Sequence, residues 1–264
     1  RWLFNLAVDP TEQNNLAQSE PETVRKLEDK NLIEIAPQIT ERDPYANEEI
    51  IPTTPLKLNP EQAKAVEKIN AESGKVFLLH GVTGSGKTEV YLQAIARALE
   101  GGKGAIVLVP EIWRTPQTVE RFKARFSSGP LQTLVAVLHS HLSTGERHDE
   151  WHKIRQGRAK IVIGARSAIF APVEPLGLVI VDEEHENSYK QEESPRYHAR
   201  DVAVVRGQRE NATVVLGSAT PSLESYHNVR RGKYTLLELP HRVDNKQMPL
   251  VRVLDMRTEK SKGD

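Results

Sequence analysis

One short segment, Gly81–Thr88, constrains the fold of this 264-residue chain more than any other part of the sequence. Its sequence, Gly-Val-Thr-Gly-Ser-Gly-Lys-Thr, fits the pattern G-x-x-x-x-G-K-[ST] of a loop that curls around a phosphate group. The apolar run Val76–Leu79 precedes it, and Glu89–Leu99 follows with apolar residues at helical spacing. A glycine-rich turn beside a strand is the simpler alternative, but the order strand, loop, helix favours a phosphate-binding loop.

Each residue type in this loop has a physical task. Glycines let backbone N–H groups surround the β-phosphate of a nucleotide. Lys87 would bring a positive charge to the β- and γ-phosphates, and the hydroxyl of Thr88 would be a ligand of Mg²⁺. We therefore expect the whole loop to hold the nucleotide: Gly81, Val82, Thr83, Gly84, Ser85, Gly86, Lys87 and Thr88.

From Leu58 onward, short β-branched runs alternate with helical patterns. Further strands are expected at Ala105–Val109, Leu134–Leu138, Ile161–Ile163, Leu178–Val181 and Thr213–Leu216. Helix starts lie between several of them: Thr115-Pro116, with proline at the first helical position, the capping box Ser143–Glu146, and a second Thr-Pro start at Thr220-Pro221. This alternation predicts an α/β fold with a mainly parallel sheet and helices on both faces.

A second acidic motif follows one of these strands. Leu178–Val181 runs directly into Asp182-Glu183-Glu184-His185. Asp182 would hold Mg²⁺, and Glu183 would orient or deprotonate the attacking water. An acidic quartet on a solvated surface is the alternative. Because ligands of open α/β sheets gather at the carboxyl ends of strands, we expect this motif and the glycine-rich loop to share one crevice.

Two further segments carry side chains suited to coupling or to nucleic-acid contact. The strand Thr213–Leu216 leads into Ser218 and Thr220, whose hydroxyls can connect the nucleotide site with other surfaces, although a helix cap accounts for Thr220 equally well. Between Ser188 and Asp201, aromatic rings offer faces for base stacking and cations offer phosphate contacts: Tyr189, Lys190, Arg196, Tyr197 and Arg200. An ordinary surface loop is the alternative for this second segment.

The formal net charge of zero hides an asymmetry along the chain. Residues 1–56 carry 5 basic and 11 acidic residues, whereas residues 57–264 carry 31 basic and 25 acidic ones. The positive excess is compatible with a phosphate-rich partner such as DNA, and equally with chance surface asymmetry.

The sequence has no cysteine, which excludes a disulfide framework and a Cys-ligated metal site within these residues. It also has no membrane-length apolar run and no secretory signal, so we expect a cytoplasmic protein without a membrane partner.

The loop, the Asp-Glu-x-His motif and Ser-Ala-Thr, in this order, resemble the first motor lobe of superfamily 2 helicases. A larger set of segments narrows the resemblance to the bacterial replication-restart helicase family: Leu58–Gln62, Gly81–Tyr91, Leu108–Ile112, Thr115–Gln117, His139-Ser140, Gly164–Pro172 and Gly217–Ser222. Trp113-Arg114 departs from the small or polar residue followed by leucine that is usual in this family. Residues 1–30 weakly resemble the C-terminal tail of sulfatases and carry no sulfatase catalytic residue.

The resemblance implies a RecA-like P-loop NTPase lobe over residues 57–243. The charge pattern and turn signals predict an acidic leader and linker over residues 1–56 with one short helix around Glu22–Lys30, and the resemblance adds a winged-helix remnant at 30–56. Residues 244–264 would begin the connection to a second lobe. Gln62 would contact adenine, and His185 would link hydrolysis to DNA contact through Ser218 and Thr220. The expected catalytic residues are Lys87, Asp182, Glu183 and His185, and Arg166 and Ser167 join the expected DNA-binding or coupling residues.

The activity implied is that of an ATP- and Mg²⁺-dependent 3′→5′ DNA helicase that reloads the replication machinery at stalled forks. Its partners would be branched and single-stranded DNA, single-stranded-DNA-binding protein and other primosome proteins. The second lobe with its arginine finger and the zinc-binding cysteines are expected elsewhere in the full-length protein, so this chain alone should bind nucleotide weakly and hydrolyse it poorly. Another superfamily 2 translocase, RecG-like or of the restriction type, and a non-catalytic nucleic-acid-binding lobe are the alternatives.

Overall fold

The computed structural model describes residues 26, 27, 29, 30, 51–110, 115–126 and 128–244. The chain divides into two units, residues 1–46 and 47–264. In the first unit, residues 26, 27 and 29 are helical, in agreement with the short helix expected there. Most of the expected winged-helix remnant, Trp113-Arg114 and nearly all of the expected connection at 244–264 lie outside the described residues.

The second unit is built around a seven-stranded parallel sheet, whose strand order is β3-β4-β2-β5-β8-β1-β9. Its strands are β1 (Val76–Gly81), β2 (Gly104–Leu108), β3 (Leu134–Leu138), β4 (Ala159–Gly164), β5 (Leu176–Asp182), β8 (Thr213–Ser218) and β9 (Thr235–Leu239). The central strands are buried along almost their whole length, which is why their apolar runs are continuous. Six strands match the sequence expectation, whereas β9 has no counterpart in it.

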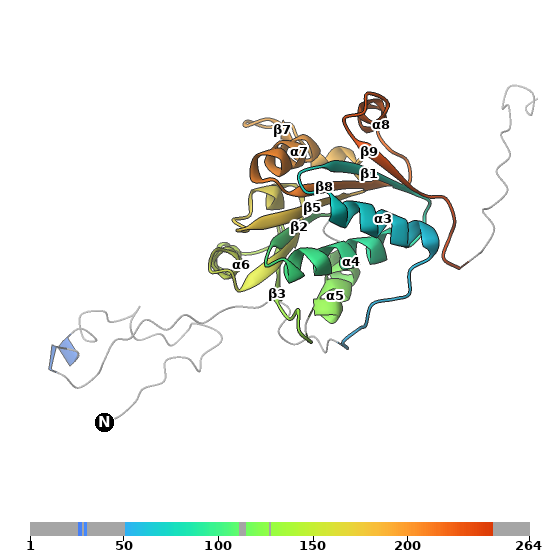
Figure 1. Cartoon of the computed structure of the whole chain (residues 1–264). Coiled ribbons are helices and arrows are strands. Elements are labelled where there is room, and N and C mark those ends of the chain that lie inside the picture. Colours follow the sequence, from blue (N-terminus) through green and yellow to red (C-terminus); the bar gives the residue numbers. More distant parts are fainter. Residues whose placement is uncertain (1–25, 28, 31–50, 111–114, 127, 245–264) are drawn as a thin grey trace, which may run out of the picture. The chain divides into compact units, whose positions relative to one another are not determined.

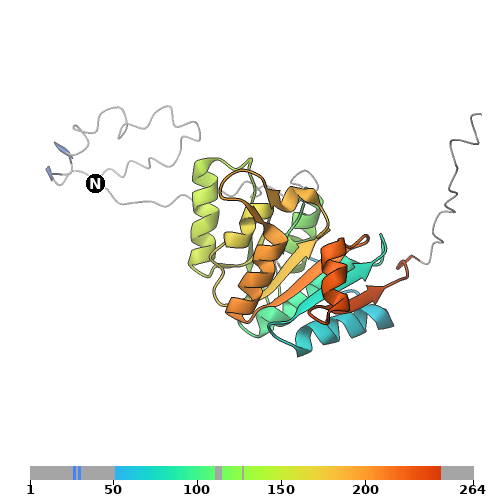
Figure 2. The same ribbon diagram turned by 90° about the horizontal axis from the view of Figure 1, so that it is seen from above.

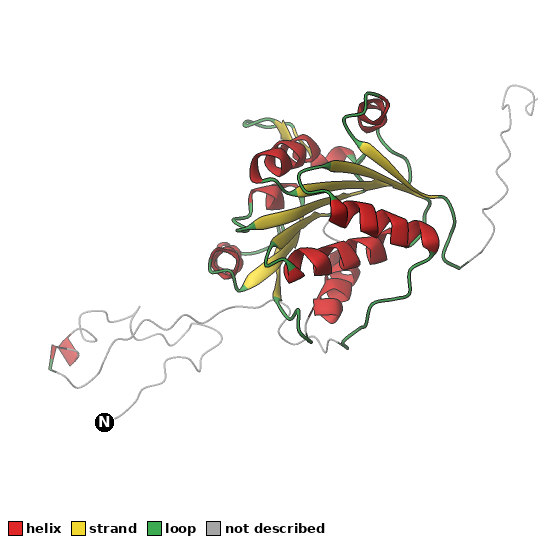
Figure 3. Ribbon diagram, in the orientation of Figure 1, coloured by secondary structure: helices red, strands yellow, loops and turns green. Residues whose placement is uncertain are grey.

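Helices cover both faces of this sheet (Figures 1 and 3). They are α3 (Pro60–Ala71), α4 (Lys87–Glu100), α5 (Thr115–Phe126), α6 (Thr144–Arg155), α7 (Ala199–Glu210) and α8 (Leu223–Arg230). From β1, α4 and α5 carry the chain toward the β3 edge, and α6, α7 and α8 carry it back toward β9. Because such crossovers are right-handed, the two groups of helices lie on opposite faces (Figure 2). The expected α/β fold of a RecA-like lobe is therefore confirmed.

Local hydrogen bonds determine where the helices begin. The expected capping box of α6 is present, because Glu146 N donates to Ser143 Oγ at 3.3 Å and Ser143 N donates to Glu146 Oε2 at 2.8 Å. The expected start at Thr220-Pro221 is wrong, since α8 begins at Leu223 with Ser222 as its N-cap. Thr220 is engaged elsewhere: its N–H donates to Ser218 Oγ at 2.9 Å.

The sheet order brings the carboxyl ends of three strands together. Strand β8 lies between β5 and β1, and its Gly217 pairs with Asp182 on one side and with Leu79 on the other. The loop after β1, the acidic motif after β5 and the residues after Ser218 therefore open on the same edge. Within the described residues, no helix has the length and apolar character needed to cross a membrane.

Candidate active site

The glycine-rich loop joins β1 to α4 with two residues in the left-handed backbone region. Gly84 has a φ of 81° and Gly86 a φ of 80°, a conformation that side chains other than glycine rarely adopt. A Cβ at Gly86 would also collide with Nε2 of Gln62. Gly86 is the N-cap of α4 and provides no side-chain cap, so the first N–H groups of the helix can bind an anion.

Two buried polar side chains lie at the loop, Gln62 of α3 and Ser85 of the loop itself. Gln62 is 4% exposed; its Nε2 donates to Ser85 O at 2.8 Å, and its Oε1 accepts from Asn59 N at 3.0 Å. Gln62 therefore fixes the loop against α3, and its contact with adenine stays a prediction. The buried hydroxyl of Ser85 has no hydrogen-bond partner among the described residues.

Lys87 brings the loop and the acidic motif together. Its Nζ donates to Gly81 O at 2.9 Å and lies 3.8 Å from Glu183 Oε1. The two motifs thus meet at the carboxyl edge of the sheet, next to each other as the sequence predicts. Glu183 itself has a φ of 46°, which is unusual for a residue with a long side chain. Backbone strain of this kind is concentrated at functional sites. The strained turn therefore agrees with a role for Glu183, whose carboxylate it directs toward Lys87.

Asp182 is held by two buried tyrosines. Tyr91 Oη donates to Asp182 Oδ1 at 3.0 Å, and Tyr189 Oη donates to the carbonyl oxygen of Asp182 at 2.6 Å. Burial, with a smaller contribution from the charge of Glu183, raises the pKa of Asp182 from 3.8 to about 6. Burial also raises the pKa of Tyr91 well above its ordinary value, so this phenol remains a donor. Sequence patterns assign no role to Tyr91, because its partner lies 91 positions away.

We predict that the Asp182 carboxyl of the metal-free chain titrates near pH 6. Because its folded pKa lies above the ordinary value, this group contributes less to the free energy of unfolding as pH rises from about 4 to 6. Tyr91→Phe should raise the pKa further, since the phenol stabilises the ionised form. Carboxyl ¹³C chemical shifts measured against pH test both statements. A midpoint near 3.8 in the wild-type chain would contradict the first statement, and an unchanged or lower midpoint in Tyr91→Phe would contradict the second.

His185 contacts both hydroxyls that follow β8. Its Nδ1 lies 2.8 Å from Ser218 Oγ, and its Nε2 lies 3.4 Å from Thr220 Oγ1. Ser218 is fully buried. The structure therefore brings together the three residues expected to couple hydrolysis to DNA contact, and their role stays a prediction.

A residue without an expected role, Glu184, lies at the centre of a buried hydrogen-bond network. It has no exposed surface. Its carboxylate accepts from Arg200 Nη1 at 3.1 Å, from Ser222 N at 2.7 Å and from Ser225 Oγ at 2.8 Å. Glu184 thus ties the acidic motif to α7 and α8.

Burial contradicts the expected DNA contacts of Arg200 and Tyr189, while their alternative role in coupling stays a prediction. Arg200 is 8% exposed, and its guanidinium is bound to Glu184 and to Ser222 Oγ. Tyr189 has no exposed surface, so its ring offers no free face to a base. Both side chains turn inward because Glu184 and the Asp182 carbonyl provide buried acceptors for them.

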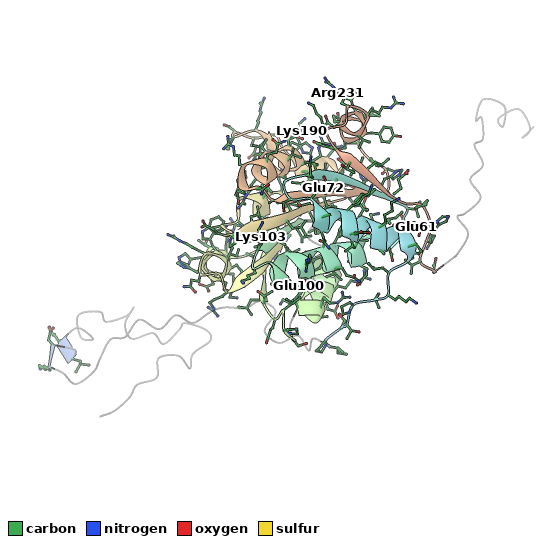
Figure 4. All side chains as sticks on the ribbon, in the orientation of Figure 1. Glu61, Glu72, Glu100, Lys103, Lys190 and Arg231 are labelled. Atoms are coloured by element: carbon green, nitrogen blue, oxygen red, sulfur yellow. The ribbon has the colours of Figure 1, made fainter. Side chains whose placement is uncertain are left out.

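The other expected DNA contacts remain accessible. Lys190 and Arg196 are exposed, and they line an open cavity of about 600 Å³ together with Gln191, Glu192, Tyr197 and His198 (Lys190 is labelled in Figure 4). These residues belong to a small antiparallel hairpin, β6 (Lys190–Gln191) and β7 (Tyr197–His198), which follows the short 3₁₀ helix η4 (Asn187–Tyr189).

A second 3₁₀ helix, η3 (Arg166–Phe170), supports this hairpin. Arg166 Nη1 donates to Lys190 O at 2.6 Å, and Phe170 packs edge-to-face on Tyr197 with ring centroids 5.2 Å apart. Ser167 is exposed on η3. Arg166 therefore positions the hairpin, while DNA contact by Arg166 and Ser167 stays a prediction.

The residues at this edge of the sheet fit a nucleotide with Mg²⁺. In the described part of the chain, no group of three or more His, Cys, Asp or Glu side chains could hold a metal by itself. A cation between Thr88 and Asp182 would therefore take its remaining ligands from phosphate and water, which is the usual coordination of Mg²⁺. It would also stabilise the ionised form of Asp182 in its buried position.

The comparisons with known proteins agree with this geometry. The family model described as "DEAD/DEAH box helicase" matches residues 59–229. The chain belongs to the DEAD/DEAH box helicases. Within this family it is 54% identical, over 91% of its length, to replication restart protein PriA of Bacillus subtilis (strain 168), and 49% identical, over 80% of its length, to that of Chlamydia pneumoniae. The resemblance to replication-restart helicases is therefore confirmed.

The chain spans 30% and 28% of the lengths of these two relatives. Among solved structures, it is similar to the DUF1998 helicase MrfA bound to DNA, with a TM-score of 0.51 and 16% identity over 69% of this chain and 27% of that one. At this identity the likeness concerns the fold alone.

Proposed function

We propose that this chain is the ATP- and Mg²⁺-binding first motor lobe of a 3′→5′ DNA helicase that acts at stalled forks in replication restart. One observation carries the proposal: Lys87 Nζ lies 3.8 Å from Glu183 Oε1. This distance brings the glycine-rich loop next to the acidic end of a buried strand. Membership of the DEAD/DEAH box helicases and the similarity to PriA proteins support the helicase part of it.

In this proposal, backbone N–H groups of the loop and of the first turn of α4 bind the phosphates, and Lys87 exchanges its bond to Gly81 O for a phosphate oxygen. Bound Mg²⁺ would supply a Lewis acid at the phosphates, with Thr88 and Asp182 as its protein ligands. Glu183 orients the attacking water and accepts its proton. His185 Nδ1 lies 3.7 Å from Glu183 Oε2, and the ring contacts the hydroxyls of Ser218 and Thr220, so it would transmit a movement of this carboxylate to both.

We place DNA contact at the hairpin of β6 and β7. Its two exposed cations, Lys190 and Arg196, suit phosphates, and Tyr197 suits a base. Forks and single strands as substrates, primosome proteins as partners and a cytoplasmic location belong to the same proposal, as does the assignment of the lobe to residues 57–243.

Calorimetric titration of this chain with a non-hydrolysable ATP analogue, with Mg²⁺ and with a chelator, tests the nucleotide part. We expect binding with Mg²⁺ and weaker binding without it, because Asp182 and Thr88 contribute only through the cation. Asp182→Asn should lower the affinity in Mg²⁺ toward the chelator value, because Thr88 then remains as the one proposed protein ligand of the cation. An absence of binding in both conditions would favour the non-catalytic lobe instead.

A further inference from the structure

The segment that follows β9 lies against the glycine-rich loop. Leu239 O accepts a hydrogen bond from Val82 N at 3.2 Å, and Val243 N donates to Gly84 O at 3.0 Å. His241 Nδ1 lies 3.3 Å from Glu61 Oε1 on α3 (Glu61 is labelled in Figure 4). The segment Leu239–Asp244 is thus attached to the loop at two points and to α3 at a third.

These contacts place the side chain of Arg242 on the loop itself. Its Nε and Nη2 lie 3.3 and 3.4 Å from the position that a Cβ on Gly84 would occupy. The guanidinium therefore packs on the bare backbone of Gly84. Its Nε also forms an ion pair with Asp244 at 3.3 Å, in which the two side chains are 30% and 40% exposed. Ion pairs of this exposure contribute little free energy, so the guanidinium can exchange this partner for a ligand.

The surroundings indicate which part of a nucleotide Arg242 faces. The carbonyl of Gly84 is engaged by Val243 N, so the segment lies on the carbonyl side of the loop and not among the N–H groups that would surround the phosphates. A Cβ position on Gly86 has Gln62 Nε2 and Val243 Cγ2 as its close neighbours. Gln62, Arg242 and Val243 therefore border the same rim of the loop.

A nucleotide whose phosphates lie inside the loop must leave its ribose and base outside, at a rim of this kind. A planar guanidinium binds the face of an aromatic ring by stacking and by cation–π attraction. Val243, which is 61% exposed, adds apolar surface beside it. We propose that Arg242 is a further nucleotide-binding residue, which packs its guanidinium on the base of the bound nucleotide. This inference rests on the nucleotide binding proposed above.

Calorimetric titration of the full 264-residue chain with MgADP tests this role. Arg242→Ala should weaken binding about tenfold, within the roughly 3- to 30-fold range of a cation–π contact. Arg242→Lys should lie between the two, because it keeps the charge and loses the planar face. Arg97→Ala is the matched control: Arg97 is an exposed arginine of α4 paired with Glu100, and its loss should leave the affinity unchanged.

Inorganic tripolyphosphate, titrated as a competitor of ADP, shows whether Arg242 contacts the base or the phosphates of the nucleotide. Its affinity should be equal for the wild-type chain and for Arg242→Ala, because it has no base. An equal loss for ADP and tripolyphosphate would overturn the base contact. Wild-type affinity for ADP in Arg242→Ala would overturn the role of Arg242 altogether. If the wild-type chain itself fails to bind ADP, the proposed function has failed, and this inference fails with it.

Discussion

Lys87→Ala should weaken MgADP binding to this chain about a hundredfold, which corresponds to about 3 kcal/mol. The Lys87 side chain is 10% exposed, and its ammonium group already lies at the loop, bound to Gly81 O. Charge-assisted hydrogen bonds to phosphate are the strongest polar contacts that such a site offers, and truncation of one partner typically costs about 2–5 kcal/mol. Calorimetric titration of wild type and variant measures the loss.

Lys64→Ala provides the control for this prediction, because Lys64 is an exposed lysine on α3 that contributes nothing to the loop. In a full-length helicase that contains this lobe, Lys87→Ala should abolish unwinding and leave fork binding largely intact, since the cations of the β6–β7 hairpin are unchanged. Unwinding at a near-normal rate by the variant would contradict the role of Lys87.

The sequence predicts most of the fold because its central strands are buried on both faces. Continuous apolar runs such as Leu178–Val181 are typical of strands covered by helices on both sides, and each run ends at a turn or a polar motif. Strand β9 is hard to predict because it lies at the sheet edge, where its burial is partial and its pattern includes an exposed glutamate. The start of α8 differs from the expected one because Ser222, and not Thr220, caps the helix.

The sequence predicts a site residue well where the residue type alone determines its role. It predicts a site residue less well where a hydrogen-bond partner in the folded chain determines the orientation of the side chain. The lysine of the loop lies beside the acidic pair at the end of β5, as the spacing predicts. Tyr189 and Arg200 look like DNA contacts in the sequence, since an aromatic ring and a cation in a polar stretch usually face solvent. Their inward orientation depends on buried acceptors that only the folded chain brings near them.

The contacts of Tyr91 and Arg242 likewise cannot be predicted from the local sequence. Tyr91 reaches Asp182 across 91 positions of sequence, and Arg242 meets Gly84 only because β9 pairs with β1. Sheet order, which sets both contacts, follows from the packing of the whole layer and not from any local pattern. The left-handed backbone of Glu183 is likewise fixed by its surroundings, because glutamate has no intrinsic preference for that region.

Glu184→Ala should lower the free energy of unfolding by about 3–5 kcal/mol, the usual cost of leaving one partner of a buried ion pair alone. The carboxylate has no exposed surface, and its removal leaves the guanidinium of Arg200, the N–H of Ser222 and the hydroxyl of Ser225 without their acceptor. Equilibrium unfolding in urea measures the change.

Two variants show whether the buried network is the cause of that loss. Glu186→Ala removes a neighbouring glutamate that is 47% exposed, and should cost less than about 1 kcal/mol. Glu184→Gln keeps the shape of the side chain and one acceptor oxygen but removes the charge that faces Arg200, so its cost should lie between those of the two alanine variants. If Glu184→Ala cost no more than Glu186→Ala, the network would not stabilise the contacts of the acidic motif with α7 and α8. The inward orientation of Arg200 would then have to arise from its contacts with Asp201 and Ser222 alone.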